Sequence, residues 1–446
     1  MALEGENVTQ PSRSRSTELG LMVVAWFIVT AFYVLMNLAT KGRLPPRLDV
    51  FLGGIIVVSV AMHLAIRRYA PFSSQVLLPV ATLLNGIGYV EIARWNPAHA
   101  GLQAFWFVVS AVIVVATLKL VRSVRDLDRY RYLTLTGAII LMLLPLIPHF
   151  GENINGARLW VALGPLSFQP IEIAKILLVF FFASYFAANR ELLSTPTQRV
   201  GGRLIVPPRV IVPIFVAWGV ALMILGGEND IGFAMLLFAL FFALLWVTTG
   251  LKSYVALGLV LFAAGGAAAY KFFPQVHQRV SIWLDPWSVA NFSHSSQLAY
   301  AWIFTSSGGV FGTGLGLGHS GAYVGEISSD MIFATLAEEL GFIGIILILS
   351  LFAVFVGEGF RIAQRSHSDF VRLTATALTA TIGLQAFFIM AGVLRLVPFT
   401  GITLPFMAYG GSSLFANYLI VALLLRISHE NNTERRGGEI VAISFD

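Results

Sequence analysis

Stretches of about 20 apolar residues with few charges recur along the whole of this 446-residue chain. A helix of that length can cross the roughly 30 Å hydrocarbon core of a bilayer. Such stretches lie near residues 19–40, 49–66, 71–93, 103–121, 132–148, 169–188, 210–226, 231–249, 253–271, 331–356, 371–394 and 410–427. We therefore expect an all-α polytopic membrane protein with about twelve transmembrane helices and no soluble domain.

The composition excludes a water-soluble enzyme. Charged residues make up 12% of the chain and apolar residues 57%, whereas soluble domains carry about a quarter charged residues. The sequence contains no cysteine, which excludes disulfides, thiolate catalysis and cysteine metal sites. A formal net charge of +6 is ordinary for a protein that faces anionic membrane lipid, and it indicates no nucleic-acid partner.

Both ends of the chain are polar. Residues 1–18 have little apolar surface to bury, so we expect a disordered tail there, and the apolar run that follows lacks the cleavage site of a signal peptide. Residues 429–446 form a second tail, and the transmembrane domain spans 19–428. The positive-inside rule places both tails in the cytoplasm, because roughly twenty basic residues then lie inside against about eight outside.

In this orientation two outward-facing segments, 149–168 and 272–330, are long and chemically diverse. Loops of this kind are where function is expected in a compact membrane protein. Residues 226–230, in contrast, connect two spans so tightly that the spans must form a hairpin. Glu228 and Asp230 in that turn are expected to cap the hairpin, and the alternative is a contact with a cation or a polar headgroup.

The first outward segment and the helix start after it contain a candidate anion site. Glu172 near a helix N-terminus complements the helix dipole, and Lys175 lies three residues further on the same face. These two residues can simply form a local ion pair on a capped helix. Alternatively, Arg158 and Lys175 form a cationic site for phosphate. In that case Glu172 orients the site and Trp160 forms its floor.

Asp330 follows two serines at the start of the span near 331–356. It can be an N-cap residue and nothing more. Asp330 and Glu338 lie on one helical stripe, however, and carboxylates at a membrane surface are costly and usually functional. An aspartate at the outer mouth can accept a proton from a sugar hydroxyl. For Glu338 and Glu339, hydrogen bonds to neighbouring helices are the favoured interpretation.

Two further segments have unusual backbone requirements. Residues 306–321 contain seven glycines but no Gly-Lys-Ser/Thr, so this is not a P-loop. They form either closely packed backbone or a loop whose amides approach a phosphate or a sugar. Residues 398–413 carry prolines and glycines into the last span. A broken backbone at this depth needs cover from protein or water, which predicts a cavity near the outer leaflet.

Seven segments occur in a fixed order over roughly residues 130–428: GARLW, FQPIEIAK, GGENDIGFAMLLF, QRVSIWLDPW, SSGGVFGTGLGLG, SSDMIFATLAEELGFIG and PFTGITLPFMAYGGSSLFANYLIVALLLRIS. Together they resemble the SEDS family (shape, elongation, division and sporulation), the RodA/FtsW/SpoVE group of peptidoglycan glycosyltransferases. The resemblance implies a ten-helix core. The two additional spans then lie at the N-terminal end, an arrangement similar to that of actinobacterial RodA or FtsW homologues.

The resemblance implies a lipid II polymerase that makes β-1,4-linked glycan strands at the outer face of the bacterial cytoplasmic membrane, for cell elongation or division. The donor is then a glycan on polyprenyl diphosphate, and the acceptor is the 4-hydroxyl of a lipid II N-acetylglucosamine. The implied partner is a class B penicillin-binding protein, a transpeptidase. A divalent cation (Mg or Mn) would suit the diphosphate, although no ligand set is readable, and no other cofactor is implied.

Site residues follow from the same resemblance. The family's essential aspartate falls on Asp330, which we expect to act as general base. Its Arg-Trp pair falls on Arg158 and Trp160, and its Glu and Lys fall on Glu172 and Lys175. Arg158 and Lys175 would stabilise charge on the leaving diphosphate, while Trp160 would pack against a sugar ring or lipid head.

Arg279 and Gln297, in the second outward segment, are further candidates for substrate binding. The chain departs from the family pattern at several positions. Gln297 ends a His-Ser-Ser-Gln stretch where the family has Gly-Tyr-Gln, Ser329 replaces a threonine, Asn229 replaces a proline, and Arg395 enters a stretch that is usually neutral.

A lipid II flippase, a transporter of lipid-linked precursors, is the alternative from another functional class. A carrier would place its charged groups near the membrane midplane, usually between repeated halves. Here the informative charges lie at the outer mouth and no internal repeat is visible. This pattern favours the enzyme.

Overall fold

The computed structural model describes residues 15–443, apart from 46–47, 149, 155–156, 165, 196–197 and 201–202. The expected N-terminal tail therefore lies mostly outside the described residues. Its last part is ordered, because the first helix begins at Ser16. At the other end, the last helix continues beyond residue 428, where a polar tail was expected.

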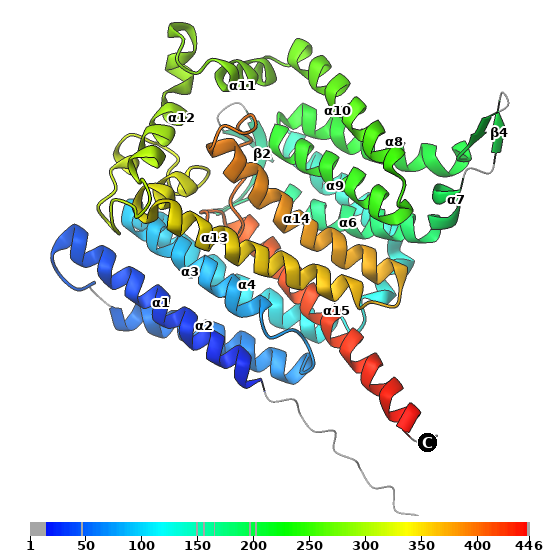
Figure 1. Ribbon diagram of the computed structural model, residues 1–446, viewed down its shortest axis with the longest axis horizontal. Coiled ribbons are helices and arrows are strands. Elements are labelled where there is room, and N and C mark those ends of the chain that lie inside the picture. Colours follow the sequence, from blue (N-terminus) through cyan, green and yellow to red (C-terminus); the bar gives the residue numbers. More distant parts are fainter. Residues whose placement is uncertain are drawn as a thin grey trace, which may run out of the picture.

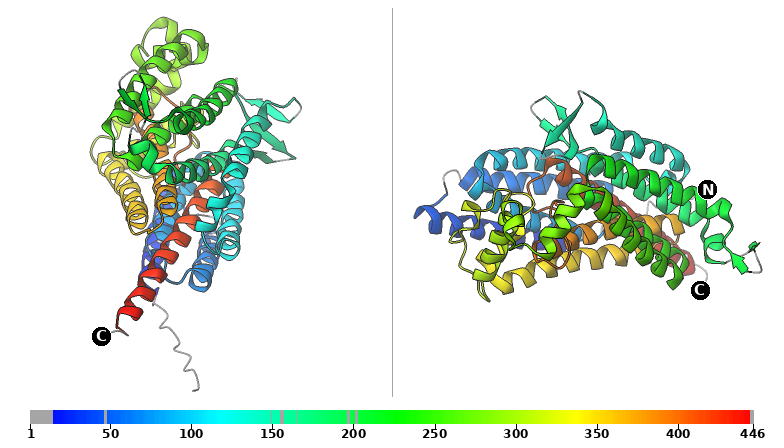
Figure 2. Two further views of the ribbon diagram at one scale, coloured as in Figure 1. Left: turned by 90° about the vertical axis from the view of Figure 1, so that its right-hand side faces the viewer. Right: turned by 90° about the horizontal axis from the view of Figure 1, so that it is seen from above.

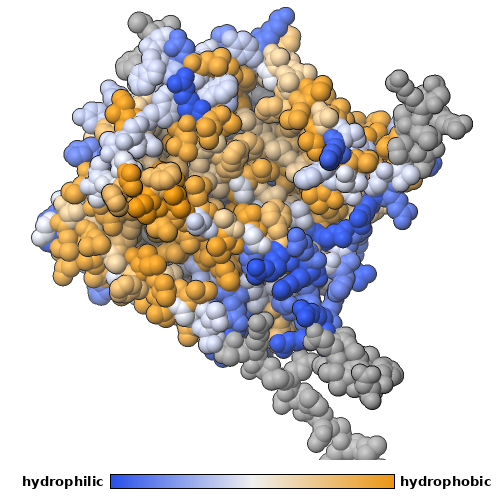
Figure 3. All heavy atoms as spheres, in the orientation of Figure 1, coloured by the Kyte–Doolittle hydropathy of each residue, from blue (hydrophilic) through white to orange (hydrophobic). Residues whose placement is uncertain are grey.

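The described residues are almost entirely helical. Ten of their helices are long and apolar enough to cross a membrane: α1 (Ser16–Lys41), α2 (Leu48–Tyr69), α4 (Pro97–Leu120), α6 (Ile171–Ala188), α8 (Pro208–Glu228), α9 (Ile231–Thr249), α10 (Lys252–Phe272), α13 (Ile332–Gln364), α14 (Asp369–Val393) and α15 (Gly411–Ile443). On the face of the molecule that Figure 3 shows, apolar side chains cover most of the surface between its polar ends. The polytopic all-α architecture is thus confirmed.

The count of twelve spans is not confirmed. Helices do form at the two other expected positions, as α3 (Leu77–Trp95) and α5 (Arg131–Leu143). Helix α5 has 13 residues, which rise only about 20 Å, and a short 3₁₀ helix, η2 (Leu144–Leu146), extends it. Helix α3 is mostly buried against other helices and carries polar residues such as Asn85 and Glu91, because a helix surrounded by protein needs no lipid-facing surface.

The first outward segment forms a small antiparallel sheet instead of an irregular loop. Strand β2 (Ala157–Leu163) lies between β1 (Gly151–Ile154) and β3 (Leu166–Phe168), with Val161 opposite both Gly151 and Phe168. The remaining described elements are η1 (Arg125–Tyr130), α7 (Arg190–Ser194), β4 (Gln198–Val200), β5 (Arg203–Ile205), α11 (Pro274–Leu284), α12 (Val289–Ser307) and η3 (Ser320–Ala322).

Helix α15 forms the centre of the bundle. It packs against α4, α6 and α14, and its membrane portion is almost completely buried. Helices α1 and α2 lie together on one side of the bundle, where α1 contacts α3 and α2 contacts α4 (Figure 1). On the other side, α9 packs against α14 and α6, while α10 is nearly all exposed. The N-terminal pair is therefore an addition to one flank of the bundle.

The two outward segments lie at the same end of the molecule. In Figure 1 the helices run obliquely, with β2, α11 and α12 toward the top and left and the C-terminus toward the lower right. A second view shows the start of α1 and the end of α15 at the same end of the molecule (Figure 2). This arrangement gathers 149–168 and 272–330 on one side of the apolar belt, as their sequence predicted.

Candidate functional site

Asp330 lies in a turn that leads directly into α13. The backbone N–H groups of Ser329 and Met331 both donate to the carbonyl of Glu326, at 3.2 and 3.1 Å, and so close this turn. Asp330 is partly buried. Burial and the nearby charge of Glu326 together raise the pKa of its carboxyl to about 8, and Arg279 opposes the shift. Asp330 is thus a carboxylate of unusually high basicity.

Arg279 of α11 faces Asp330. Its Nη1 donates to the carbonyls of Thr400, at 2.7 Å, and Phe399, at 3.2 Å. A β-carbon on Gly401 would lie 3.6 Å from Oδ2 of Asp330 and 3.7 Å from Nη2 of Arg279. The carboxylate and the guanidinium therefore border the same point of the backbone. Burial lowers the pKa of Arg279, and the charges of nearby carboxylates counter that effect.

Asp230 is the residue that links Arg279 to the rest of the site. It caps α9 by accepting a hydrogen bond of 2.9 Å from the N–H of Phe233, as the hairpin prediction implied. Its other oxygen, Oδ2, is buried and has no hydrogen-bond partner in the described part of the chain. Burial raises the pKa of Asp230 to about 6, with Arg279 lowering it and Glu172 raising it. Asp230 thus interacts with charges on both sides.

Glu172 and Lys175 form the predicted ion pair, with Oε2 and Nζ 2.5 Å apart. Lys175 also donates to Oε1 of Gln385 at 2.9 Å, and Gln385 in turn donates to the carbonyl of Thr403 at 3.0 Å. Both charged side chains are almost fully buried. The pair therefore connects the start of α6 to α14 and to the irregular segment before α15.

Electrostatic interactions relate four of the predicted site residues to Asp230 in one series of charges, and within it Glu172 and Lys175 form a direct ion pair. The order is Asp330, Arg279, Asp230, Glu172 and Lys175. Asp230 was expected only to cap its hairpin, with a cation or headgroup contact as the alternative. The signal for its larger role was a connection of five residues that holds two carboxylates between two apolar spans.

Arg158, Trp160 and Gln297 do not belong to this series of charges. Arg158 is exposed on β2, and Trp160 is partly buried on the same strand, opposite Glu152. Gln297 is partly buried on α12. Among the described residues, no hydrogen bond or ion pair connects these three side chains to Asp330 or Lys175. Their roles as substrate contacts stay predictions.

Two aromatic residues hold the backbone near Asp330. The ring of His99, at the start of α4, stacks on Tyr409 with centroids 4.0 Å apart. His99 Nδ1 lies 3.2 Å from Oγ of Ser328, and the N–H of Tyr409 donates to the Ser328 carbonyl at 2.8 Å. Neither residue was singled out from the sequence, because only the tertiary fold brings positions 99, 328 and 409 together.

Arg395 explains one departure from the family pattern. Its Nε and Nη2 each donate at 2.9 Å, to the carbonyls of Trp283 and Leu284 respectively. The indole of Trp283 donates back to the Arg395 carbonyl at 3.1 Å. This arginine therefore fastens α11, which carries Arg279, to the end of α14.

Glu338 and Glu339 accept hydrogen bonds from the backbone of the glycine-rich loop, residues 306–321. Glu338 accepts hydrogen bonds from the N–H groups of His319 and Ser320, and Glu339 accepts them from Gly316 and Gly318. Arg94 of α3 forms an ion pair with Glu339 and donates to the carbonyl of Gly316. The loop amides are thus used within the protein, which favours closely packed backbone.

A cavity of about 970 Å³ lies between α8, α9, α10, α11 and residues 396–399. Its walls are almost wholly apolar, and Asp230 and Arg279 form part of its lining. The sequence predicted a cavity near the broken segment 398–413, and this one adjoins it. The described residues include no group of three His, Cys, Asp or Glu side chains placed to hold a metal ion. A divalent cation therefore stays a prediction.

Comparison with known proteins identifies the family. Residues 76–433 match the family described as cell cycle protein, FtsW/RodA/SpoVE. The chain belongs to this family. Because the match begins at residue 76, α1 and α2 precede the matched region, which contains α3 to α15.

Several relatives are similar over most of the chain. Peptidoglycan glycosyltransferase RodA of Mycobacterium tuberculosis is 36% identical over 430 residues, which cover 94% of this chain and 91% of the relative. RodA of Mycobacterium leprae is 36% identical over 378 residues, with 82% and 80% covered. A probable peptidoglycan glycosyltransferase FtsW of Legionella pneumophila is 33% identical over 306 residues, with 68% and 74% covered.

Solved structures confirm the fold. A chain from a peptidoglycan synthase complex that coordinates polymerization and crosslinking aligns with a TM-score of 0.65 and 24% identity, covering 80% of this chain and 98% of that one. The rod shape determining protein RodA of Thermus thermophilus aligns with a TM-score of 0.56 and 23% identity, covering 80% and 97%.

Proposed function

We propose that this protein is a peptidoglycan glycosyltransferase that polymerises lipid II into β-1,4-linked glycan strands. Membership of the FtsW/RodA/SpoVE family supports this reaction class, as do relatives of that name that match 94% of the chain. The single observation that carries the site assignment is the partly buried Asp330, whose carboxylate borders the guanidinium of Arg279.

In this reaction the acceptor 4-hydroxyl attacks the anomeric carbon of the donor sugar. The bond from that carbon to the polyprenyl diphosphate breaks, and the diphosphate leaves with the electron pair. Asp330 accepts the hydroxyl proton as the new bond forms. A carboxylate whose pKa is about 8 is a stronger base than an ordinary aspartate and is still partly ionised near neutral pH.

Positive charge close to the reacting groups stabilises the diphosphate as it leaves. Arg279 borders Asp330 and supplies such a charge at the base itself. Arg158 is exposed on β2 and is available for bidentate contact with phosphate, with Trp160 beside it for a sugar ring. Lys175 is already engaged by Glu172 and Gln385, so it acts by fixing the network behind Asp230. Gln297 is a further proposed contact to substrate.

The apolar cavity next to Arg279 suits a polyprenyl chain. Its walls include Trp218, Phe238, Phe262 and Phe273, which offer apolar contacts to such a chain. Arg279 and Asp230 also line it, so a chain held there places its diphosphate close to the charged network. Fixing a lipid-linked substrate in this way supplies part of the orientation that a two-substrate reaction requires.

We also propose on which side of the membrane the site lies and which protein is its partner. The site faces the outside of the bacterial cytoplasmic membrane and both termini face the cytoplasm, as the distribution of basic residues predicts. A class B penicillin-binding protein is the proposed partner, and support comes from the structural relative that belongs to a peptidoglycan synthase complex. Mg²⁺ or Mn²⁺ on the substrate diphosphate is proposed as an aid to its departure.

Incubation of the purified protein with labelled lipid II in detergent tests this function. We expect a ladder of glycan products, with and without the partner, and its loss in Asp330→Ala. Asp126→Asn is the matched control, because it removes an exposed carboxylate from η1 and should leave the ladder unchanged. Polymerisation needs no compartment, so a lipid II flippase would give no ladder here. Undiminished polymer from folded Asp330→Ala would remove Asp330 from the mechanism.

A further inference from the structure

A second cavity, of about 310 Å³, lies at the far end of α13 from Asp330. It is enclosed by the start of α1, the turn at 73–76, the end of α13 and the last part of α15. The helical turns of α13 that follow Gly341 alone separate it from Asp330 by roughly 30 Å. This cavity, which we call the basal cavity, is therefore independent of the proposed glycosyltransferase site.

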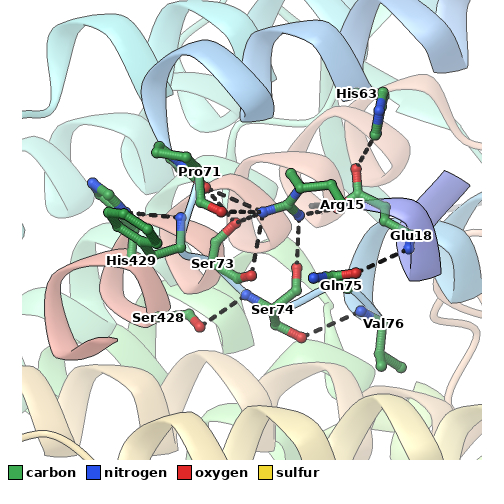
Figure 4. A network of polar contacts seen from close by, with 12 residues as sticks. Arg15, Glu18, His63, Pro71, Ser73, Ser74, Gln75, Val76, Ser428 and His429 are labelled. Atoms are coloured by element: carbon green, nitrogen blue, oxygen red, sulfur yellow. Dashed lines mark hydrogen bonds and ion pairs between the residues drawn. The ribbon is translucent and has the colours of Figure 1, made fainter. Parts of the chain in front are cut away.

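The wall of the basal cavity is built by a dense network (Figure 4). Arg15, just before α1, donates to the carbonyls of Pro71, Ser73 and Ser74 at 3.1 to 3.2 Å, and it pairs with Glu18. Figure 4 shows Arg15 at the centre of these contacts. From the other side, Ser428 of α15 accepts a hydrogen bond of 2.9 Å from the N–H of Ser74. The wall is consequently fixed before any ligand arrives.

Arg361 near the end of α13 and Arg365 directly after that helix lie four residues apart, and both line the cavity. Arg361 pairs with Glu358 at 2.9 Å, and Glu358 also accepts a hydrogen bond of 2.8 Å from Oγ of Ser74. The one carboxylate that lines the cavity is thus already neutralised. Arg365 also lines the cavity, and its side chain has no hydrogen-bond or ion-pair partner among the described residues. The basal cavity therefore carries an unmatched positive charge.

Polar side chains complete the lining. Thr17, Gln75, Asn431 and Asn432 contribute hydroxyl and amide groups opposite or beside the arginines. Hydrophilic residues gather at this end of α13 and α14, directly below the apolar belt (Figure 3). Where the apolar surface of a membrane protein ends, the phosphates of lipid headgroups lie within reach of arginine side chains.

We propose that the basal cavity binds a phosphate group, with Arg365 and Arg361 as its charged donors. Guanidinium groups match phosphate oxygens in a bidentate manner, which a carboxylate-lined or apolar cavity does not offer. The phosphate of an anionic phospholipid is the source that fits the position at the edge of the apolar belt. A soluble phosphate compound offers the same chemistry and is separated from it by experiment.

The basal cavity is lined both by the N-terminal part of the chain and by the family core. Thr17 and residues 73–75 precede residue 76, where the match to the family begins. The site is thus shared between the added α1–α2 pair and the family core. A ligand that binds only the assembled cavity stabilises the docking of α1 and α2 in proportion to its concentration and affinity.

Ligand-dependent thermal unfolding of the full chain in neutral detergent tests the proposal. The additions are phosphatidylglycerol, phosphatidylcholine and glycerol 1-phosphate, each titrated into wild type, Arg365→Gln and Arg122→Gln. Arg122 is the matched control, since it is exposed in the loop after α4 and does not line the cavity. We expect phosphatidylglycerol to raise the unfolding midpoint of wild type and of Arg122→Gln. In Arg365→Gln we expect roughly tenfold weaker binding.

Each outcome decides the proposal. Equal unfolding midpoints of the three proteins without additions would show that Arg365→Gln is folded. If glycerol 1-phosphate raises the unfolding midpoint of wild type but not that of Arg365→Gln, the phosphate site is supported and its ligand can be a soluble compound. If Arg365→Gln binds phosphatidylglycerol as tightly as wild type does, or if Arg122→Gln loses as much affinity, the basal cavity is not the binding site. A similar rise with phosphatidylcholine in all three proteins would also overturn the proposal.

Discussion

The basicity of Asp330 is set by its burial and by neighbouring charges of both signs. Burial and the charge of Glu326 raise its pKa to about 8, and Arg279 restrains that rise. Only the ionised carboxylate can accept a proton, so the polymerisation rate of wild type should increase with pH, reach half its maximum near pH 8 and level off above about pH 9. The measurement is the pH dependence of the initial rate with labelled lipid II.

Two single substitutions should move this pH profile in opposite directions. Arg279→Gln removes the charge that favours the carboxylate, so the midpoint should rise and the rate at pH 7 should fall. Glu326→Gln removes a like charge from an exposed side chain, so the midpoint should fall. Midpoints that stay at the wild-type value in both variants would show that Asp330 does not set the profile.

His99 is predicted to position Asp330 and to take no part in the proton transfer. A shift of about 1 Å at a reacting group can cost roughly 100-fold in rate, so His99→Ala should lower kcat by one to two orders of magnitude with little change in KM. His99→Phe keeps the stacking on Tyr409 and loses only the contact with Ser328. We expect partial rescue by phenylalanine, and equal kcat in all three proteins would contradict this role.

At the scale of single residues, local rules predicted local contacts. The pairing of Glu172 with Lys175 follows from their spacing of three on a helix, and the structure confirms it. The links from Asp230 to Arg279 and Glu172 were not predictable, because they join side chains from three separate segments of the chain. The same holds for His99 and Tyr409.

At the scale of elements, the buried ion pair at the start of α6 ties three parts of the bundle together. Removing one partner leaves a buried charge uncompensated, which typically costs about 3–5 kcal/mol. Lys175→Met alone should therefore lower the thermal stability strongly. The double variant Glu172→Gln with Lys175→Met should recover part of that loss, because no uncompensated charge remains. Strictly additive changes in unfolding midpoint would contradict the coupling.

The lengths of the apolar stretches in the sequence predicted the membrane helices well and the other elements poorly. The spans and the tight hairpin between α8 and α9 follow from hydropathy, since the bilayer imposes the same requirement on every helix. The strands β1 to β3 were not predicted, because their short segments are stabilised by pairing with each other. The burial of α3 also escaped prediction, since it depends on contacts with helices far away in the sequence.

At the scale of the whole molecule, the reactive carboxylate should cost stability. The folded protein holds the proton of Asp330 up to a pKa of about 8, whereas the unfolded chain releases it near pH 4. The contribution of Asp330 to the free energy of unfolding is therefore most favourable below about pH 4, where the carboxyl is protonated in both states. This contribution is lost as the pH rises toward 8. Asp330→Asn should unfold at a higher temperature than wild type at pH 8, and the difference should shrink toward pH 5. A lower midpoint for the variant at pH 8 would contradict the sign.

The most direct test of the account is a structure of the protein with donor and acceptor analogues of lipid II bound. A general base must lie within about 2.6–3.2 Å of the hydroxyl whose proton it takes, or one water molecule away. We predict that a carboxylate oxygen of Asp330 lies at that distance from the acceptor 4-hydroxyl, with the donor diphosphate on the side of Arg279. An acceptor sugar bound at the opposite end of α13, or anywhere beyond the reach of Asp330 through one water, would contradict the proposed mechanism.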